Sequence, residues 1–349
     1  MDAVPAVCAL YVVVRLSLRT ANGEHIGILM RSAVQRLLFL VALSLAPVGV
    51  QGAGIKDIQV PADVRGPKIH AVMWTPCATP PNDIKLNGLV SIPGVRDCDI
   101  QGNKLPLIVI SHGLGGESIS HHDTAEMLAD NGFIVVALDH VLDSGGDMSR
   151  SQDIAAIIER PNDIKRLLDY VPKSSEIAAK IDPLRIGFFG FSRGGYTGLA
   201  LAGAVPDFAH IPCPDMTIII CAQIHDHAVP AYSPAIEPRI KAFVIADPLS
   251  FFPSKDDLQK VTAPIQLWSS ESGGQGVLPD GVAALARNLP HKPDFHLVPN
   301  STHLSFLFPC SPTLANVARE LCTDPPGFDR SAFHKVFNEQ VLGFFREHL

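Results

Sequence analysis

The sequence has no excess of positive charge. Its 28 lysines and arginines are outnumbered by 35 aspartates and glutamates, for a formal net charge of −7, and the basic residues are scattered rather than clustered. We therefore expect no nucleic-acid partner, because binding to a phosphate backbone requires a basic face. The glycine runs match neither G-x-G-x-x-G nor G-x-x-x-x-G-K-[ST], which argues against a nucleotide-dependent enzyme.

Patterns typical of metal sites and of repeat proteins are also missing. No C-x-x-C occurs, and the triplets HHD (121–123) and HDH (225–227) have no further ligand at a supporting helical spacing. We expect no metal and no cofactor. The chain shows no internal repeat and no low-complexity tract, and 47% of its 349 residues are hydrophobic. This composition predicts one large globular domain.

The N-terminal region contains the main apolar run, but this run is short. The run Leu37–Leu45 is well below the roughly 20 residues that a transmembrane helix needs. Arg31 and Arg36 precede it, and the small residues Gly52 and Ala53 follow. This is the layout of a secretory signal peptide.

Residues 1–52 are therefore predicted to be a dispensable N-terminal extension plus signal peptide, with the signal at about 30–52. The remaining chain, 53–349, is predicted to form a single domain that is exported, either periplasmic or secreted, without a stable membrane span. The alternative is a membrane anchor made of residues 6–18 and 37–50.

Cysteine usage agrees with export. One of the seven cysteines, Cys8, lies in the predicted extension, and the other six are close in sequence as Cys77 with Cys98, Cys213 with Cys221, and Cys310 with Cys322. An even set of this kind is typical of disulfides in an oxidising compartment. Three local disulfides are predicted, and six unpaired thiols in a reducing compartment are the alternative.

Short apolar runs alternate with amphipathic stretches after residue 53. The expected strands are 68–76, 86–94, 105–113, 133–140, 185–192, 240–248, 264–272 and 295–299. The expected helices are 122–132, 160–171 and 196–204, and the second has Pro161 in its first turn. Strands that alternate with helices predict an α/β fold with a mainly parallel central sheet and helices on both faces.

Residues 190–194 read GFSRG and fit the pattern G-x-S-x-G between an expected strand and an expected helix. In that context the pattern indicates a nucleophile elbow, with glycines where the strand and helix approach closely. Ser192 is the expected nucleophile, and the N-terminus of the following helix would face the reacting group. A glycine-rich turn without chemistry is the alternative.

A serine hydroxyl needs a base and an orienting acid, in the chain order serine, acid, histidine. His303 follows the expected last strand, which favours it as the base over the other C-terminal histidines, His291, His296, His334 and His348. For the acid, Glu271 follows the next-to-last strand and Asp247 ends the strand before it. Position alone leaves the choice between these two carboxylates open.

Four ordered segments carry a resemblance to a known family: VISHGLGGESISHHDTAEMLADNGFIVVALDH, GFSRGGYTGLALAGA, RIKAFVIADP and THLSFLF. From about residue 57 to its end the chain resembles the bacterial branch of the platelet-activating factor acetylhydrolases, often labelled predicted dienelactone hydrolases. True dienelactone hydrolases use a cysteine nucleophile, whereas this chain has Ser192. The resemblance implies an α/β-hydrolase fold and an ester hydrolase of the acetylhydrolase type.

The resemblance also implies particular roles for residues. It matches Asp247 as the acid and places one oxyanion-hole N–H at Leu114 in the HGLGG loop; the residue after the nucleophile, Arg193, would supply the other. The implied substrate is a small-molecule ester or lipid with a short acyl chain, such as a phospholipid-like ester. The alternatives are a hydrolase of polyesters or small soluble esters, and a non-catalytic binding protein on a hydrolase scaffold.

Overall fold

The computed structural model describes residues 52–174, 177–211 and 219–349. The chain divides into two units, Met1–Gly49 and Val50–Leu349, and the described residues belong to the second. Apart from Gly52, the predicted extension and signal peptide lie outside the described residues. Within the described ranges, no helix has both the length and the apolar character needed to cross a bilayer.

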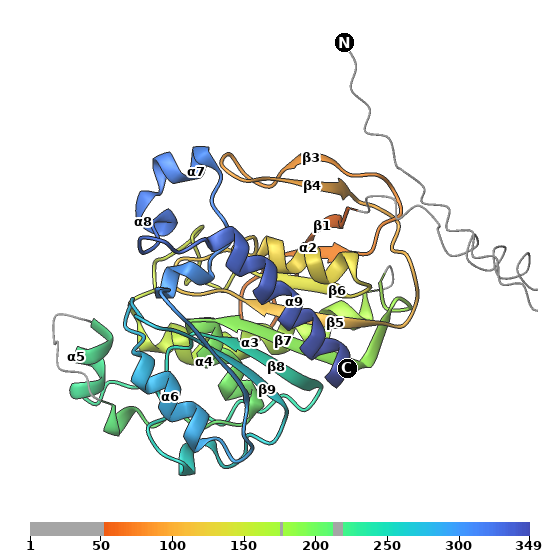
Figure 1. The fold of residues 1–349 in the computed structure, drawn as a ribbon. Helices are drawn as coiled ribbons and strands as arrows, with labels where there is room; N and C mark the ends of the chain where they lie inside the picture. The colour runs from red at the N-terminus through yellow and green to blue at the C-terminus, as the bar shows by residue number, and fades with distance from the viewer. Residues whose placement is uncertain (1–51, 175–176, 212–218) are drawn as a thin grey trace, which may run out of the picture. The chain divides into compact units, whose positions relative to one another are not determined.

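A ten-stranded sheet runs through the second unit in the order β10-β9-β8-β7-β5-β6-β2-β1-β4-β3 (Figure 1). Its strands are β1 Gly54–Val60, β2 Ile69–Thr75, β3 Asn82–Lys85, β4 Ser91–Arg96, β5 Leu105–Ser111, β6 Ile134–Leu138, β7 Ile181–Phe191, β8 Ile240–Ala246, β9 Ile265–Ser270 and β10 Asp294–Val298. The six strands from β10 to β6 are parallel, while β2 is antiparallel to both β6 and β1. The predicted α/β fold with a mainly parallel sheet is confirmed.

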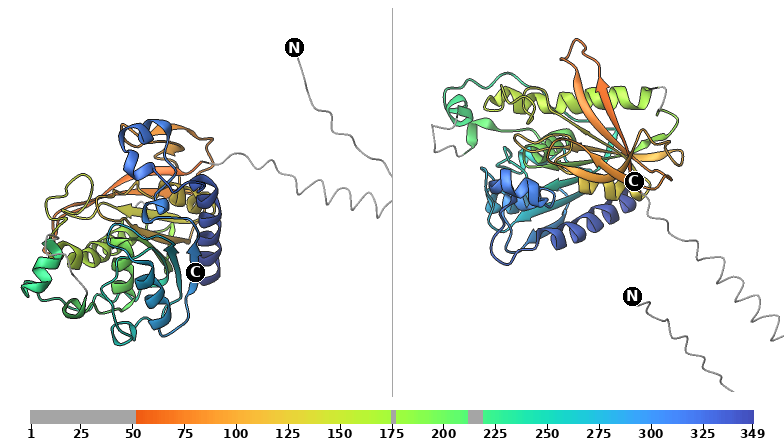
Figure 2. Two further views of the ribbon diagram at one scale, coloured as in Figure 1. Left: turned by 60° about the vertical axis from the view of Figure 1, so that its left-hand side comes forward. Right: turned by 90° about the horizontal axis from the view of Figure 1, so that it is seen from above.

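Helices cover both faces of this sheet (Figure 2). They are α2 His122–Asp130, α3 Ile154–Tyr170, α4 Arg193–Ala202, α5 Ile219–His225, α6 Pro279–Asn288, α7 Pro312–Val317, α8 Arg319–Cys322 and α9 Arg330–His348. Apolar residues of α3, α4 and α6 pack into the core on one face, and those of α2 and α9 into the core on the other.

The strands at the centre of the sheet supply both cores. Leu107 and Val109 of β5 belong to the core of α3 and α4, whereas Ile108 and Ile110 belong to the core of α2 and α9. Successive strand side chains point to opposite faces, so a strand covered on both faces is apolar throughout. This explains the unbroken apolar run that predicts a buried strand here.

Helix α3 begins earlier than the sequence pattern predicts. The prediction started it at residue 160 with Pro161 in the first turn, but it starts at Ile154 and has Pro161 in its interior. The side chain of Asp153 caps the real start by accepting a hydrogen bond from Ala155 N at 2.9 Å, and Ile154 and Ile157 are buried. This packing and capping outweigh the interior proline, which cannot donate a helix hydrogen bond.

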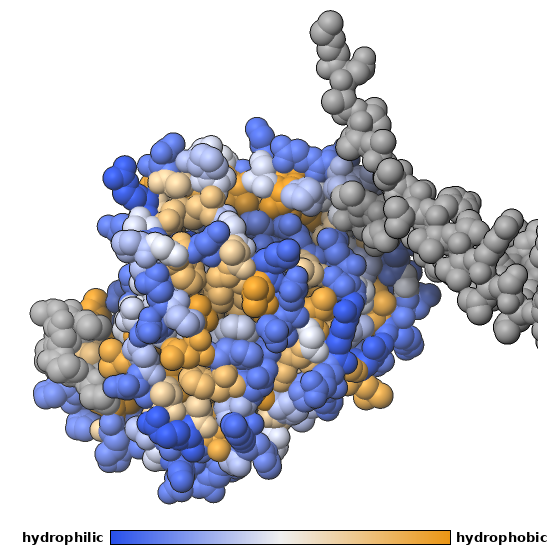
Figure 3. All heavy atoms as spheres, viewed as in Figure 1, coloured by the Kyte–Doolittle hydropathy of each residue, from blue (hydrophilic) through white to orange (hydrophobic). Residues whose placement is uncertain are grey.

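Two of the three predicted disulfides are present, Cys77–Cys98 and Cys310–Cys322. Cys213 lies outside the described residues, so its predicted pairing with Cys221 is not described. On the face of the molecule seen in Figure 3, hydrophobic and hydrophilic residues are interspersed over the second unit.

Candidate active site

Ser192 lies between the end of β7 and the start of α4, in a strained backbone conformation with φ 57° and ψ −115°. A Cβ atom at Gly190 would collide with the carbonyl of Gly194, and one at Gly194 would collide with the carbonyl of Ser111. The two glycines are therefore required for space. A non-glycine residue with positive φ is typical of a nucleophile elbow.

His303 and Asp247 meet at the carboxyl ends of the parallel strands, where Ser192 also lies. Asp247 directly follows β8 and has no exposed surface, and His303 begins the short 3₁₀ helix η4, His303–Phe306, after β10. The Nδ1 of His303 lies 2.7 Å from Oδ2 of Asp247. The carboxylate also accepts hydrogen bonds from the backbone N–H and the hydroxyl of Ser270, both at 2.8 Å.

The ring of His303 is fixed in its orientation. It stacks on Phe191, the residue before Ser192, with ring centroids 4.6 Å apart. Donation from Nδ1 to Asp247 leaves Nε2 of the neutral ring as the acceptor. This is the tautomer that a serine hydrolase requires of its base.

Glu271, the other candidate acid, does not contact the imidazole in this arrangement. Its side chain is exposed, and its Oε2 accepts a hydrogen bond from the backbone N–H of Asn300 at 2.6 Å. It therefore ties the end of β9 to the loop that precedes His303. Of the two candidate acids, Asp247 and Glu271, Asp247 is therefore the one that contacts His303.

The HGLGG loop after β5 forms a turn against the elbow. Gly116 N donates to Gly113 O at 3.3 Å, and a Cβ at Gly113 would lie 3.1 Å from the Cβ of Ser192. Leu114 lies in this turn, with its side chain 40% exposed. Arg193 is the first residue of α4, where backbone N–H groups lack acceptors within the helix. Gly113, which precedes Leu114, and Arg193 thus both lie beside Ser192.

A buried charge cluster supports this loop, and the sequence did not predict it. Arg160 of α3 donates to the carbonyl of His112 at 2.5 Å and to Asp143 at 2.7 Å. Burial, together with the nearby Arg160 and His140, holds the pKa of His112 well below its ordinary value. His112 is therefore neutral, which agrees with donation from its Nδ1 to Gly113 O at 2.7 Å and acceptance by its Nε2 from His140 N at 3.1 Å.

A second serine–histidine–aspartate group lies behind the elbow. Oγ of Ser111 is 2.8 Å from Nε2 of His140, and Nδ1 of His140 is 3.0 Å from Oδ2 of Asp163. All three residues are buried. Burial, reinforced by Arg160, holds the pKa of His140 well below its ordinary value, and burial raises the pKa of Asp163 to about 6.

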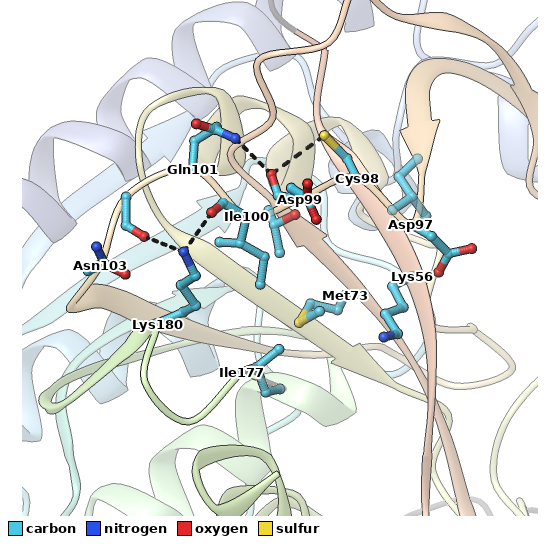
Figure 4. A pocket seen from close by; sticks show the side chains of 13 residues that line it. Lys56, Met73, Asp97, Cys98, Asp99, Ile100, Gln101, Asn103, Ile177 and Lys180 are labelled. Atoms are coloured by element: carbon cyan, nitrogen blue, oxygen red, sulfur yellow. Dashed lines mark hydrogen bonds between the residues drawn. The ribbon is translucent and has the colours of Figure 1, made fainter. Parts of the chain in front are cut away.

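A cavity of about 630 Å³ lies at the opposite end of the central strands from Ser192 (Figure 4). Lys180 lines it and donates to the carbonyls of Ile100 and Gly102 at 3.0 Å and 3.2 Å. Lys180 precedes the 11-residue strand β7, whereas Ser192 follows it. The cavity is therefore separate from the candidate site. Among the described residues, no group of three or more His, Cys, Asp or Glu side chains could hold a metal ion.

The sheet order, the helices on both faces and the sharp strand-to-helix turn at Ser192 are those of the α/β-hydrolase fold. Within this class, the family platelet-activating factor acetylhydrolase, isoform II, matches residues 88–197, which include the HGLGG loop and the elbow. The resemblance predicted from the sequence motifs is confirmed over this range. No curated protein sequence matches the chain.

Solved structures share the fold. A ferulic acid esterase from Streptomyces cinnamoneus superposes with a TM-score of 0.62 at 18% identity, covering 87% of this chain and 92% of its own. A Rhizomucor miehei esterase gives 0.50 at 14% identity, covering 93% and 91%. A putative dipeptidyl aminopeptidase IV from Bacteroides ovatus gives 0.53 at 13% identity, covering 86% of this chain but 37% of its own.

Proposed function

We propose that the protein is a serine hydrolase that cleaves carboxylic esters through an acyl-enzyme, with residues 53–349 as its catalytic domain. Ser192 is the nucleophile, His303 the base and Asp247 the orienting acid. The observation that carries the proposal is the 2.7 Å pair of His303 Nδ1 and Asp247 Oδ2 beside a serine in a strained elbow.

The reaction then proceeds in two halves. Nε2 of His303 takes the proton from Ser192 Oγ as this oxygen attacks the ester carbonyl, and the protonated ring returns it to the leaving alcohol. Water releases the acyl group by the same route. The backbone N–H groups of Leu114 and Arg193 donate to the oxyanion in both halves, and loss of one such donor costs about 3 kcal/mol of transition-state stabilisation.

The substrate that we propose is a short-chain or phospholipid-like ester. The family match names an acetylhydrolase, and two of the similar structures are esterases. The exposed apolar side chains of Leu114 and Met148 adjoin the oxyanion loop, since a Cβ at Gly115 would lie 3.3 Å from the thioether of Met148. They offer an apolar surface to an acyl chain. Polyesters and small soluble esters remain the alternative substrates.

Export of the protein is part of the proposal, with a signal peptide at about 30–52. Its support is the pair of disulfides, Cys77–Cys98 and Cys310–Cys322, because such bonds persist in oxidising compartments. The N-terminal sequence of the protein recovered from culture medium or periplasm checks this directly. A mature chain that begins near Ala53 is expected, and an uncleaved chain contradicts it.

The experiment that tests the function is covalent labelling by a fluorophosphonate, followed by a panel of acyl esters of increasing chain length. We expect the probe to label wild-type protein at Ser192 and Ser192→Ala to lose both labelling and turnover. Ser111→Ala is the matched control, because it removes another buried hydroxyl beside a histidine. A wild-type protein that is neither labelled nor active would favour a non-catalytic binding protein.

A further inference from the structure

The two oxyanion donors of the proposed mechanism are backbone N–H groups, so their directions depend on the peptide planes that hold them. In a planar trans peptide the carbonyl of one residue and the N–H of the next point in opposite directions. Whatever anchors the carbonyl of Ser192 therefore orients the N–H of Arg193. That carbonyl accepts from Tyr196 N at 3.1 Å and from Leu249 N at 3.0 Å.

The N–H of Leu114 depends in the same way on the carbonyl of Gly113. This carbonyl accepts from Nδ1 of His112 at 2.7 Å and from Nη2 of Arg160 at 3.2 Å. Nη1 of the same guanidinium donates to the carbonyl of His112 at 2.5 Å. Arg160, from α3, thus binds two consecutive carbonyls of the oxyanion loop, and by binding the Gly113 carbonyl it directs the Leu114 N–H to the opposite side of that peptide.

Asp143 connects Arg160 to the elbow at Ser192. Its carboxylate has no exposed surface. Oδ2 accepts from Nε of Arg160 at 2.7 Å, and Oδ1 accepts from Nη1 of Arg193 at 2.9 Å. The same Nη1 donates to the carbonyl of Ser151 at 2.6 Å. One buried carboxylate therefore links the arginine that holds the oxyanion loop with the arginine that follows the nucleophile.

We infer that Asp143 is a positioning residue that sets the spacing between the two oxyanion donors, acting through Arg160 and Arg193. The inference rests on the proposed function. Such donors must lie about 2.7–3.1 Å from the developing oxyanion, so a small movement of the loop relative to the elbow weakens the transition state more than the bound substrate. A carboxylate is suited to this role because its two oxygens can each accept from a different guanidinium.

The test compares Asp143→Asn with Arg160→Lys. The amide retains the volume of Asp143 but presents an NH₂ group to one arginine, and lysine retains the charge of Arg160 but cannot span the two carbonyls and Asp143. For each variant, kcat and KM are measured on a short-chain ester, along with the inhibition constant of an alkyl boronic acid, which forms a tetrahedral adduct with the serine. Thermal unfolding is followed in parallel.

We expect kcat to fall about a hundredfold in both variants with little change in KM, because removal of one oxyanion donor has an effect of that order. The boronic acid inhibition constant should rise by a similar factor, since its adduct requires the same donors. Glu237→Gln is the control: Glu237 is also buried and paired with an arginine, Arg239, at 2.5 Å, but it precedes β8 at the other edge of the sheet. It should lower the unfolding temperature and leave kcat and inhibition unchanged.

The outcomes separate the inference from the function that it rests on. Folded Asp143→Asn and Arg160→Lys proteins with wild-type kcat overturn the positioning role, and so does a loss of kcat without a matching loss of boronic acid affinity. If Asp143→Asn does not fold, Arg160→Lys decides by the same criteria. A wild-type protein that fluorophosphonate does not label at Ser192 contradicts the proposed function itself.

Discussion

Two groups of serine, histidine and aspartate lie close together in this protein, and their imidazole–carboxylate bonds are alike. His303 approaches Asp247 at 2.7 Å, and His140 approaches Asp163 at 3.0 Å, in both cases through Nδ1 and Oδ2. The hydroxyl of Ser111 also forms a hydrogen bond with Nε2 of His140. Hydrogen bonds alone therefore do not separate a reactive serine group from one that supports the fold.

The surroundings of the two groups differ. Ser111 ends a regular strand, whereas Ser192 occupies a strained turn directly before a helix N-terminus that offers N–H donors. Burial, reinforced by the nearby Arg160, holds the pKa of His140 well below its ordinary value, which disfavours the protonated ring that a general base must form. Asp247, in contrast, is held in place by three hydrogen bonds, two from the backbone N–H and hydroxyl of Ser270 and one from Nδ1 of His303.

The largest expected difference concerns the two serines. Ser192→Ala should reduce ester turnover by about a millionfold, as loss of a serine nucleophile does elsewhere. Ser111→Ala removes one buried hydrogen bond and should lower the unfolding free energy by about 1 kcal/mol while most turnover remains. Steady-state kinetics with circular dichroism measures both. Equal losses of turnover in the two folded variants would abolish the distinction between the groups.

Replacement of the two aspartates should affect the reaction unequally, as replacement of the two serines does. Asp247→Asn can reduce the acylation rate by up to about four orders of magnitude, because the amide no longer fixes the tautomer of His303 or stabilises its charge. Asp163→Asn should leave the acylation rate near the wild-type value. Pre-steady-state release of a chromogenic alcohol gives the rate. A near-normal Asp247→Asn, with collapse of Glu271→Gln instead, would transfer the role of the acid to Glu271.

The pH dependence of stability should expose the buried carboxyl of Asp163. Its pKa is raised from 3.8 to about 6 by burial, so between these values the folded state binds the proton more tightly than the unfolded state. The unfolding free energy attributable to this group therefore falls as pH rises through that window, by up to about 3 kcal/mol. Asp163→Asn should remove this contribution. Denaturant titrations from pH 4 to 7 on both proteins check it, and parallel curves would refute it.

The smallest expected effect concerns the hydroxyl that supports Asp247. Ser270→Ala removes a 2.8 Å hydrogen bond to this carboxylate and should lower kcat about tenfold, in line with a net 1–1.5 kcal/mol for one hydrogen bond. Ser269→Ala is the matched control, because the Ser269 hydroxyl donates to a backbone carbonyl at 3.1 Å instead. Kinetics on both variants tests whether the support of the acid matters.

The residues proposed for catalysis could be found from the sequence because each follows a recognisable strand. Ser192, Asp247 and His303 come after β7, β8 and β10, and the carboxyl ends of parallel strands meet at one edge of the sheet. The choice of Asp247 over Glu271 came from the family resemblance. Position alone did not decide it, because both residues follow strands and only the packing of the loops selects between them.

The buried charge cluster of Arg160 and Asp143, which supports the HGLGG loop, could not be predicted in this way. Arg160 lies within α3, but the sequence pattern began this helix at Arg160 itself because of Pro161, and no local signal marks a buried arginine. Asp143 lies in the loop after β6, where an aspartate is ordinary. Their pairing depends on contacts between residues 17 positions apart, which only the packed fold brings together. Strand β1 was likewise missed.

The disulfide Cys310–Cys322 encloses helix α7 and most of α8, on the segment that follows His303. A protease that cuts between these cysteines would leave the two fragments covalently joined. The C-terminal fragment carries α9, whose Phe337 and Phe345 are buried in one of the two cores. A nicked chain would therefore keep this helix covalently attached, and would lose it only after both the peptide bond and the disulfide are broken.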